Sequence, residues 1–133
     1  MRIHDVFPLL LSLPILAGCG TNPPALVPVK GKLTLNGRPL KGATVVFTPD
    51  RAKGGRGPQS FAVTADDGTF ALGTKDGPGA TAGWHQITVA PPANDRELLT
   101  LMEKFLDPDR AGLHREVKSI GENRIDLPLD VTP

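Results

Sequence analysis

The fold is decided by the stretch from Val29 to Phe47, which reads VKGKLTLNGRPLKGATVVF. Between Val29 and Leu35, apolar residues alternate with lysine and threonine, and Asn36-Gly37 follows as a turn signal. A second run, residues 43–48, again alternates, which places Val45 and Phe47 on one face. These two runs predict neighbouring strands that direct their apolar side chains into one core.

Five further runs are typical of short strands bounded by turn residues: 61–64, 69–72, 84–90, 113–119 and 124–129. The tetrapeptide Ala65-Asp66-Asp67-Gly68 lies between the first two of these runs and predicts a hairpin. With 15 glycines and 14 prolines among 133 residues, the chain is suited to many short strands joined by turns. We therefore expect an all-β fold, a seven-stranded antiparallel β-sandwich with one short helical insertion. Its predicted core contains Leu33, Leu35, Val45, Phe47, Phe70, Ile87 and Val89.

The helical insertion is predicted over Asn94–Leu106, where the apolar spacing changes from two residues to three or four. Asn94 is the expected N-cap, Glu97 follows three residues later, and Pro108 is expected to end the segment. An isolated helix of about three turns is marginal in water, so its apolar face must pack against the sheet or against a partner. That face contains Leu98, Leu101, Met102 and Phe105.

Three motifs together resemble a known family. Residues 29–47 resemble the opening hairpin of carboxypeptidase regulatory-like domains, which have a transthyretin-like (prealbumin-like) fold. Thr64–Phe70, TADDGTF, resembles the TDxDGxF turn of that family, and Gly83–Val89, GWHQITV, resembles its GxYxVxV strand. Residues 113–129 are similar to the closing strand pair of small bacterial lipoproteins with this domain. The resemblance covers residues 27–130.

The start of the chain carries a different signal. An apolar run from Val6 to Leu16 leads into Leu16-Ala17-Gly18-Cys19, which matches the bacterial lipobox and contains the single cysteine. This run is about half the length that a transmembrane helix needs. We expect residues 1–18 to be a lipoprotein signal peptide and Cys19 to carry the lipid. Residues 19–28 would then be a proline-rich tether, and residues 29–130 the domain.

These features indicate an exported protein held at a membrane through the lipid on Cys19. Gly20, in the place of an aspartate, favours the outer membrane. The formal net charge of +1 argues against nucleic acid as a partner. A cell-envelope protein, a peptide or a glycan is the kind of partner that we expect.

Several polar groups have both a functional and a structural interpretation. Asp66 and Asp67 supply too few carboxylates for a calcium loop, which favours a tight turn. His85 and His114 lie on different predicted strands with no cysteine available, so we expect no metal site, and a buried, hydrogen-bonded role for His85. A set of basic residues lies among glycines without a P-loop motif, which favours a solvated loop: Arg51, Lys53 and Arg56.

No group of acid, base and nucleophile can be named in the sequence, so we expect a non-catalytic domain without cofactors. Trp84 is predicted to lie on the outward face of its strand, where it either binds a sugar ring or a peptide or is covered by the helix. The residues expected to contact a ligand or partner are Trp84, Leu98, Leu101 and Phe105. A structural or interaction module is the expected function, with a carbohydrate- or peptide-binding accessory protein as the alternative.

Overall fold

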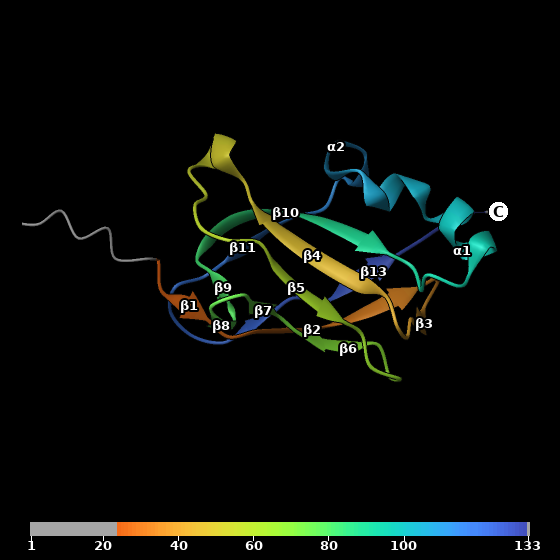
Figure 1. The fold of residues 1–133 in the computed structure, drawn as a ribbon, viewed down its shortest axis with the longest axis horizontal. Coiled ribbons are helices and arrows are strands. Elements are labelled where there is room, and N and C mark those ends of the chain that lie inside the picture. Colours follow the sequence, from red (N-terminus) through yellow and green to blue (C-terminus); the bar gives the residue numbers. More distant parts are fainter. Residues whose placement is uncertain (1–23, 133) are drawn as a thin grey trace, which may run out of the picture.

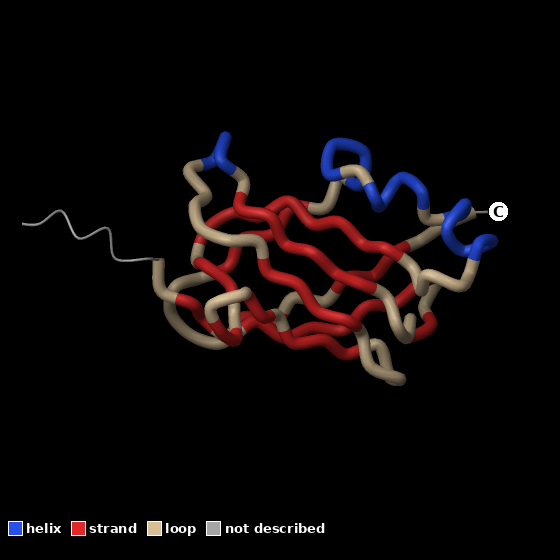
Figure 2. The backbone as a smooth tube through the Cα atoms, in the orientation of Figure 1, coloured by secondary structure: helices blue, strands red, loops and turns tan. Residues whose placement is uncertain are grey.

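The computed structural model describes residues 24–132, and this part of the chain is mostly β-structure (Figure 1, Figure 2). The larger sheet has six strands, in spatial order β11 (His114–Val117), β10 (Gly83–Ala90), β4 (Thr44–Pro49), β5 (Ser60–Val63), β7 (Gly73–Thr74) and β8 (Gly77–Pro78). The five-stranded sheet is centred on β2 (Val29–Leu35), which pairs with β3 (Arg38–Pro39), β6 (Thr69–Ala71), β12 (Asn123–Arg124) and β13 (Leu127–Leu129). A separate pair consists of β1 (Leu26–Val27) and β9 (Ala80–Thr81).

The core lies between the two larger sheets, and strands of both sheets contribute to one apolar cluster. The alternation in the sequence identifies most of it. Six of the seven predicted core side chains are buried: Leu33, Val45, Phe47, Phe70, Ile87 and Val89. The seventh, Leu35, is half-buried and packs against the cluster. The predicted core is thereby confirmed.

The runs at residues 29–35 and 43–48 lie in different sheets, as β2 and β4, so the prediction that they are neighbouring strands is wrong. After the Asn36-Gly37 turn, the chain pairs with β2 only over the two residues of β3. Residues 40–43 then cross to the six-stranded sheet, where β4 pairs with β5 and β10. Alternation shows which face of a strand is apolar, but a core between two sheets accepts that face from either side.

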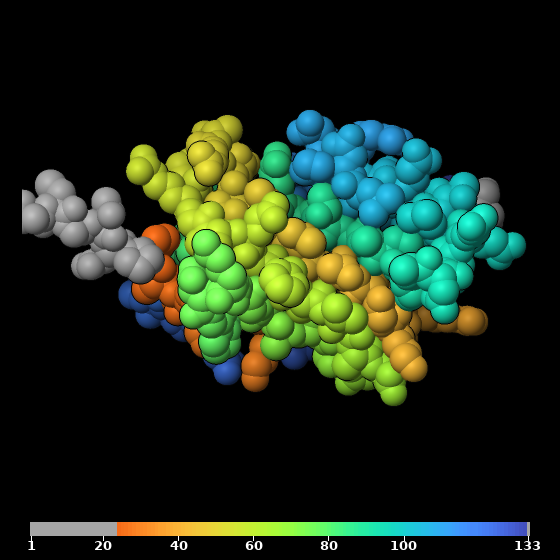
Figure 3. Space-filling view, viewed as in Figure 1, coloured from red at the N-terminus to blue at the C-terminus, as the bar shows by residue number. Residues whose placement is uncertain are grey.

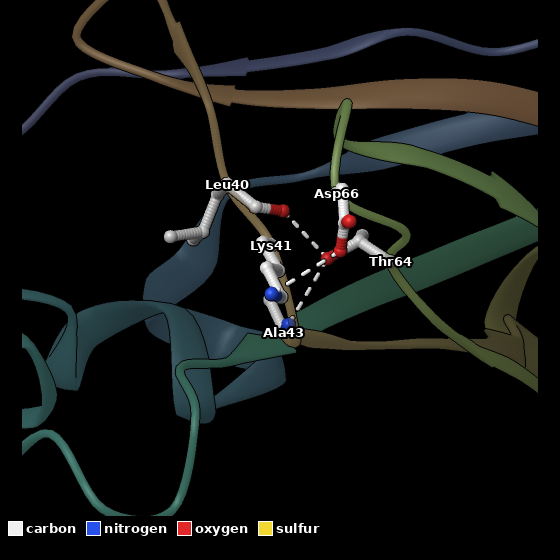
Figure 4. Close-up of polar contacts among 5 residues, drawn as sticks. All are labelled: Leu40, Lys41, Ala43, Thr64 and Asp66. Atoms are coloured by element: carbon white, nitrogen blue, oxygen red, sulfur yellow. Dashed lines mark hydrogen bonds and ion pairs between the residues drawn. The ribbon is translucent and has the colours of Figure 1, made fainter.

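Thr64 holds this crossing in place (Figure 4). Its hydroxyl donates a hydrogen bond to Leu40 O at 2.5 Å and accepts one from Ala43 N at 3.0 Å. Its backbone N–H donates to Ala43 O at 2.9 Å, and Gly42 N donates to Thr64 O at 3.0 Å. Thr64 is 4% exposed and Ala43 is fully buried, so these bonds satisfy backbone groups that water does not reach. The crossing is therefore held by four hydrogen bonds of one residue, two through its hydroxyl and two through its backbone.

The predicted turn at residues 65–68 is confirmed, but the hairpin around it is wrong. Ala65 N donates to Thr69 O and Gly68 N donates to Ala65 O, both at 2.9 Å, which closes a tight turn. On either side of the turn, β5 pairs with β4 whereas β6 pairs with β2 in the other sheet. The chain crosses between the sheets here because Leu33 N donates to Gly68 O, which attaches the turn to β2.

The prediction of an entirely antiparallel fold is also wrong in one place, because β12 and β13 run parallel to β2. The pairing begins with Asn123 opposite Val29, so β12 starts beside the first residue of β2 and runs in the same direction. Gly31 permits this approach, since a Cβ atom at this position would lie 1.8 Å from Ile125 O and 2.7 Å from Phe70 Cζ. The remaining strand pairs are antiparallel.

The predicted single helix is divided into short pieces: α1 (Arg96–Leu101), the 3-10 turn η2 (Glu103–Leu106) and α2 (Pro108–Ala111). A further 3-10 turn, η1 (Arg51–Lys53), follows β4. Asp95, not Asn94, is the N-cap of α1, because its carboxylate accepts a hydrogen bond from Leu98 N at 2.9 Å. Pro108 begins α2 and does not end the segment, since proline is well suited to the first helical position. The prediction of one continuous helix of about three turns is therefore wrong.

Candidate functional site

Trp84 lies at the start of β10 on the outer face of the six-stranded sheet, as predicted, and is 37% exposed. A lysine covers its ring, because Lys53 Nζ lies 4.4 Å from the ring centroid in a cation–π arrangement. The helical segment packs beside the other end of β10 (Figure 1). Trp84 is therefore an exposed aromatic side chain next to a cation.

The loop that supplies Lys53 is built on Asp50 and is attached to β10. Asp50 N donates to Trp84 O at 2.8 Å, and Asp50 O accepts hydrogen bonds from Lys53 N at 3.0 Å and Gly55 N at 2.8 Å. The Asp50 carboxylate accepts from Ala52 N at 3.1 Å and caps η1. At Gly55, an added Cβ atom would lie 2.6 Å from Asp50 N, so no side chain fits there.

The outer side of this loop forms an open hollow of about 380 Å³, lined by Arg51, Gly54, Gly55, Arg56 and Gly57. Arg51, Lys53 and Arg56 are all exposed, as expected for a solvated loop. We call the three side chains the basic loop. They carry three positive charges on one loop, and the exposed ring of Trp84 lies beside them.

The helical segment packs on its own domain. Met102 is fully buried and Phe105 is 4% exposed, both within the main apolar cluster, and Leu98 packs against that cluster. Leu101 is 38% exposed and does not share this packed face. Of the predicted contact residues, Phe105 is therefore a core residue, Leu98 is half-buried, and Leu101 and Trp84 are accessible.

His85 is buried with 1% exposure, and its Nδ1 lies 3.0 Å from Gly83 O, which confirms the packed, hydrogen-bonded role. Its ring centroid lies 5.8 Å from that of Phe47. Burial lowers the pKa of His85 below its ordinary value, and the hydrogen bond to Gly83 O opposes this only in part. The pKa shift therefore favours the neutral imidazole.

Three buried side-chain atoms have no hydrogen-bond partner in the described residues: Ser60 Oγ, His85 Nε2 and His114 Nδ1. Ser60 Oγ therefore forms no hydrogen bond with His85 or His114.

The Asp66-Asp67 pair has structural partners. Asp67 Oδ1 accepts hydrogen bonds from Thr69 N at 3.1 Å and Thr69 Oγ1 at 2.6 Å, and these bonds lower the pKa of Asp67. Asp66 forms an exposed ion pair with Lys41 at 3.3 Å (Figure 4). Within residues 24–132, no three acidic, histidine or cysteine side chains come together as a metal site. The tight-turn interpretation of this pair is confirmed.

Cys19, the predicted lipidation site, lies outside the described residues. Among residues 24–132, the structure contains no helix with the length and hydropathy required to cross a bilayer.

No family model, curated protein or solved structure matches the chain.

Two exposed apolar groups were not predicted from the sequence as contact sites. Phe61 and Val63 lie on the outer face of β5 and are 54% and 64% exposed, while the smaller Ser60 and Ala62 face the core. The residues of this strand alternate with a period of two, but that pattern predicts that the larger apolar side chains, Phe61 and Val63, face the core, and the structure has the opposite. Leu99 and Leu106, in the helical segment, are 44% and 41% exposed. The helical spacing leaves both of them off the predicted apolar face, in agreement with their exposure.

Proposed function

We propose that the protein is an exported lipoprotein, anchored to a membrane through Cys19, whose domain is a non-catalytic structural or interaction module. The observation that carries the proposal is the complete Leu16-Ala17-Gly18-Cys19 motif at the end of an apolar run. Two or three acyl chains at one cysteine provide stable anchoring, since each buried methylene contributes about 0.8 kcal/mol. The predicted location is the outer membrane, facing the periplasm.

The finer fold assignment is part of this proposal. Two facing sheets with a common core are compatible with a transthyretin-like sandwich, and the motifs at residues 29–47, 64–70 and 83–89 favour a carboxypeptidase regulatory-like domain. In such a sandwich the interaction surfaces are the outer faces. Phe61 and Val63, which share the outer face of β5 and are both exposed, support a surface that binds another component of the cell envelope.

The anchoring is tested by mass spectrometry of the mature N-terminus from membrane fractions. We expect an acylated Cys19 as the first residue, and accumulation of an unprocessed precursor for Cys19→Ser. A double variant, Cys19→Ser with Gly20→Cys, moves the thiol by one position and serves as a positional control that should not restore processing before residue 19. An intact Met1, or cleavage elsewhere with an unmodified Cys19, contradicts the proposal.

A second candidate function is an accessory protein that binds a carbohydrate or a peptide. The exposed ring of Trp84 favours it, because aromatic rings stack on sugars and anchor peptides. Glycan arrays and peptide pull-downs with the wild type and Trp84→Ala distinguish the two functions. Binding that depends on Trp84 would assign the accessory role, and unchanged binding by Trp84→Ala would reject it.

A further inference from the structure

The basic loop lies at the end of the domain where the chain enters from its N-terminal side (Figure 1, Figure 3). Gly57 is so close to this entry point that an added Cβ atom would lie 3.2 Å from Pro24 Cγ and 2.6 Å from Thr81 Cγ2. Thr81 Oγ1 also donates a hydrogen bond to Arg56 O at 3.0 Å, and Thr81 pairs with Leu26 in the β1–β9 sheet. The loop is thus attached to the first strand of the described chain.

The charges of the basic loop are available to an external anion. Among residues 24–132, no carboxylate lies within ion-pair distance of Arg51, Lys53 or Arg56. The one carboxylate of the loop itself, Asp50, is 8% exposed and is engaged as the cap of η1. Glu116 is exposed and lies opposite Trp84 in the register of β10 and β11, and it forms no ion pair with the three cations.

The other end of the domain has a different charge. The helical segment, residues 94–111, contains five carboxylates and three basic side chains, and it lies away from the basic loop (Figure 1). An anionic surface would therefore attract the end with the basic loop more strongly than the end with the helical segment. This asymmetry favours one orientation at an anionic layer.

The chain length brings the basic loop close to the membrane. This step rests on the proposed acylation of Cys19. Pro24 is five positions after Cys19, and a fully extended chain of that length spans at most about 18 Å. Surface charges act over about 10 Å at ordinary ionic strength, so a tether at about half of its full extension brings the loop within range of the headgroups. A tryptophan beside lysine and arginine is a common combination at the membrane interface.

We propose that the basic loop, together with Trp84, is a contact surface for anionic lipid headgroups. Arg51, Lys53 and Arg56 bind the headgroup phosphates, and the Trp84 ring lies at the headgroup level. The lipid on Cys19 supplies the anchoring, and the basic loop sets the orientation. The acidic helical segment and the exposed leucines on it then face away from the bilayer.

The test uses the full mature lipoprotein reconstituted into vesicles that carry a dansyl-labelled headgroup lipid. Trp84 is the single tryptophan, so energy transfer from tryptophan to dansyl reports its distance from the headgroups. We expect more transfer in vesicles of phosphatidylcholine mixed with phosphatidylglycerol than in phosphatidylcholine alone. High salt should abolish the increase. The triple variant Arg51→Gln, Lys53→Gln, Arg56→Gln should lose it as well.

A matched control removes three exposed basic side chains at the opposite end: Arg38→Gln, Lys41→Gln and Arg96→Gln. It changes the net charge by the same amount, and we expect it to retain the increase. Equal transfer on both kinds of vesicle, or an increase that survives in the basic-loop variant, overturns the proposal. A change in Trp84 emission with inorganic phosphate, without an increase on phosphatidylglycerol, would assign the loop to a soluble anion and also overturn it.

Failure of the anchoring itself gives a different result. Flotation of the protein with the vesicles and the mass of the N-terminal peptide report acylation independently of Trp84. A protein that floats on every vesicle but shows no dependence on anionic lipid retains the proposed function and loses this inference. A protein that does not float and carries no acyl chain loses the proposed function.

Discussion

Replacing Thr64 by valine should destabilise the domain more than most single substitutions. Valine keeps the branched shape but removes the hydroxyl, so Ala43 N loses its acceptor and Leu40 O loses its donor. A buried polar group left unpaired costs about 1–3 kcal/mol. Two such groups give an expected loss of about 2–6 kcal/mol in the free energy of unfolding, which is a large part of the ~5–15 kcal/mol typical of a domain.

The matched control is Thr64→Ser, which keeps the hydroxyl and removes one methyl group. Its expected loss is about 1 kcal/mol, the value of a buried methyl or methylene. The measurement is urea unfolding of both variants and the wild type, followed by the fluorescence of Trp84. A valine variant within about 0.5 kcal/mol of the wild type, or a serine variant as unstable as the valine variant, would refute the reasoning about the crossing.

Two further changes test the helical segment and the buried histidine. Phe105→Asp should strongly lower the free energy of unfolding, because this side chain is 4% exposed, whereas Leu101→Asp, at 38% exposure, should change it little. Urea unfolding measures both effects. Equal effects would show that the helical segment packs differently. The pKa of His85 is lower in the folded state than its ordinary value of about 6.5, so below that pH the unfolded chain binds more protons than the folded chain. The free energy of unfolding should therefore fall as the pH is lowered from about 6.5 toward the folded pKa. His85→Phe should remove that part of the pH dependence, measured by unfolding at several pH values, and an unchanged profile would show that other groups cause it.

The positions of the strands could be predicted from the sequence because they depend on local alternation and turn residues. Each of the seven predicted runs contains a strand, and the core residues Phe47 and Ile87 follow from the period of two. The pairing of the strands could not be predicted in the same way. It depends on contacts such as those of Thr64 with Leu40 and Ala43, across more than twenty residues, and the local pattern carries no information about them.

The candidate site was predictable only in part for a similar reason. Trp84 was recognised because its neighbours His85 and Ile87 define the inner face of β10. The hollow beside it depends on Asp50, which folds the loop back through hydrogen bonds to Lys53 and Gly55. The glycines and basic residues of the loop do not predict this loop conformation, because the attachment of the loop to Trp84 O is a tertiary contact.

The central position of β2 has a consequence for how the protein folds. All four of its partner strands come later in the sequence, and the last ones are far away. Lys32 N donates a hydrogen bond to Asp126 Oδ1 across 94 residues, and Asn36 bonds to Val131 across 95. Contacts of such high sequence separation slow folding, since the entropy of closing a long loop is lost before the strand gains its neighbours.

A chain emerging from its N-terminal side therefore presents β2 long before β13 is available. During this interval β2 has no partner on the side where β12 and β13 later pair, so the five-stranded sheet is incomplete. For a protein that is exported and acylated at Cys19, as proposed above, the pairing of β13 with β2 forms only after most of the domain has crossed the membrane, because β13 is the last strand of the described residues.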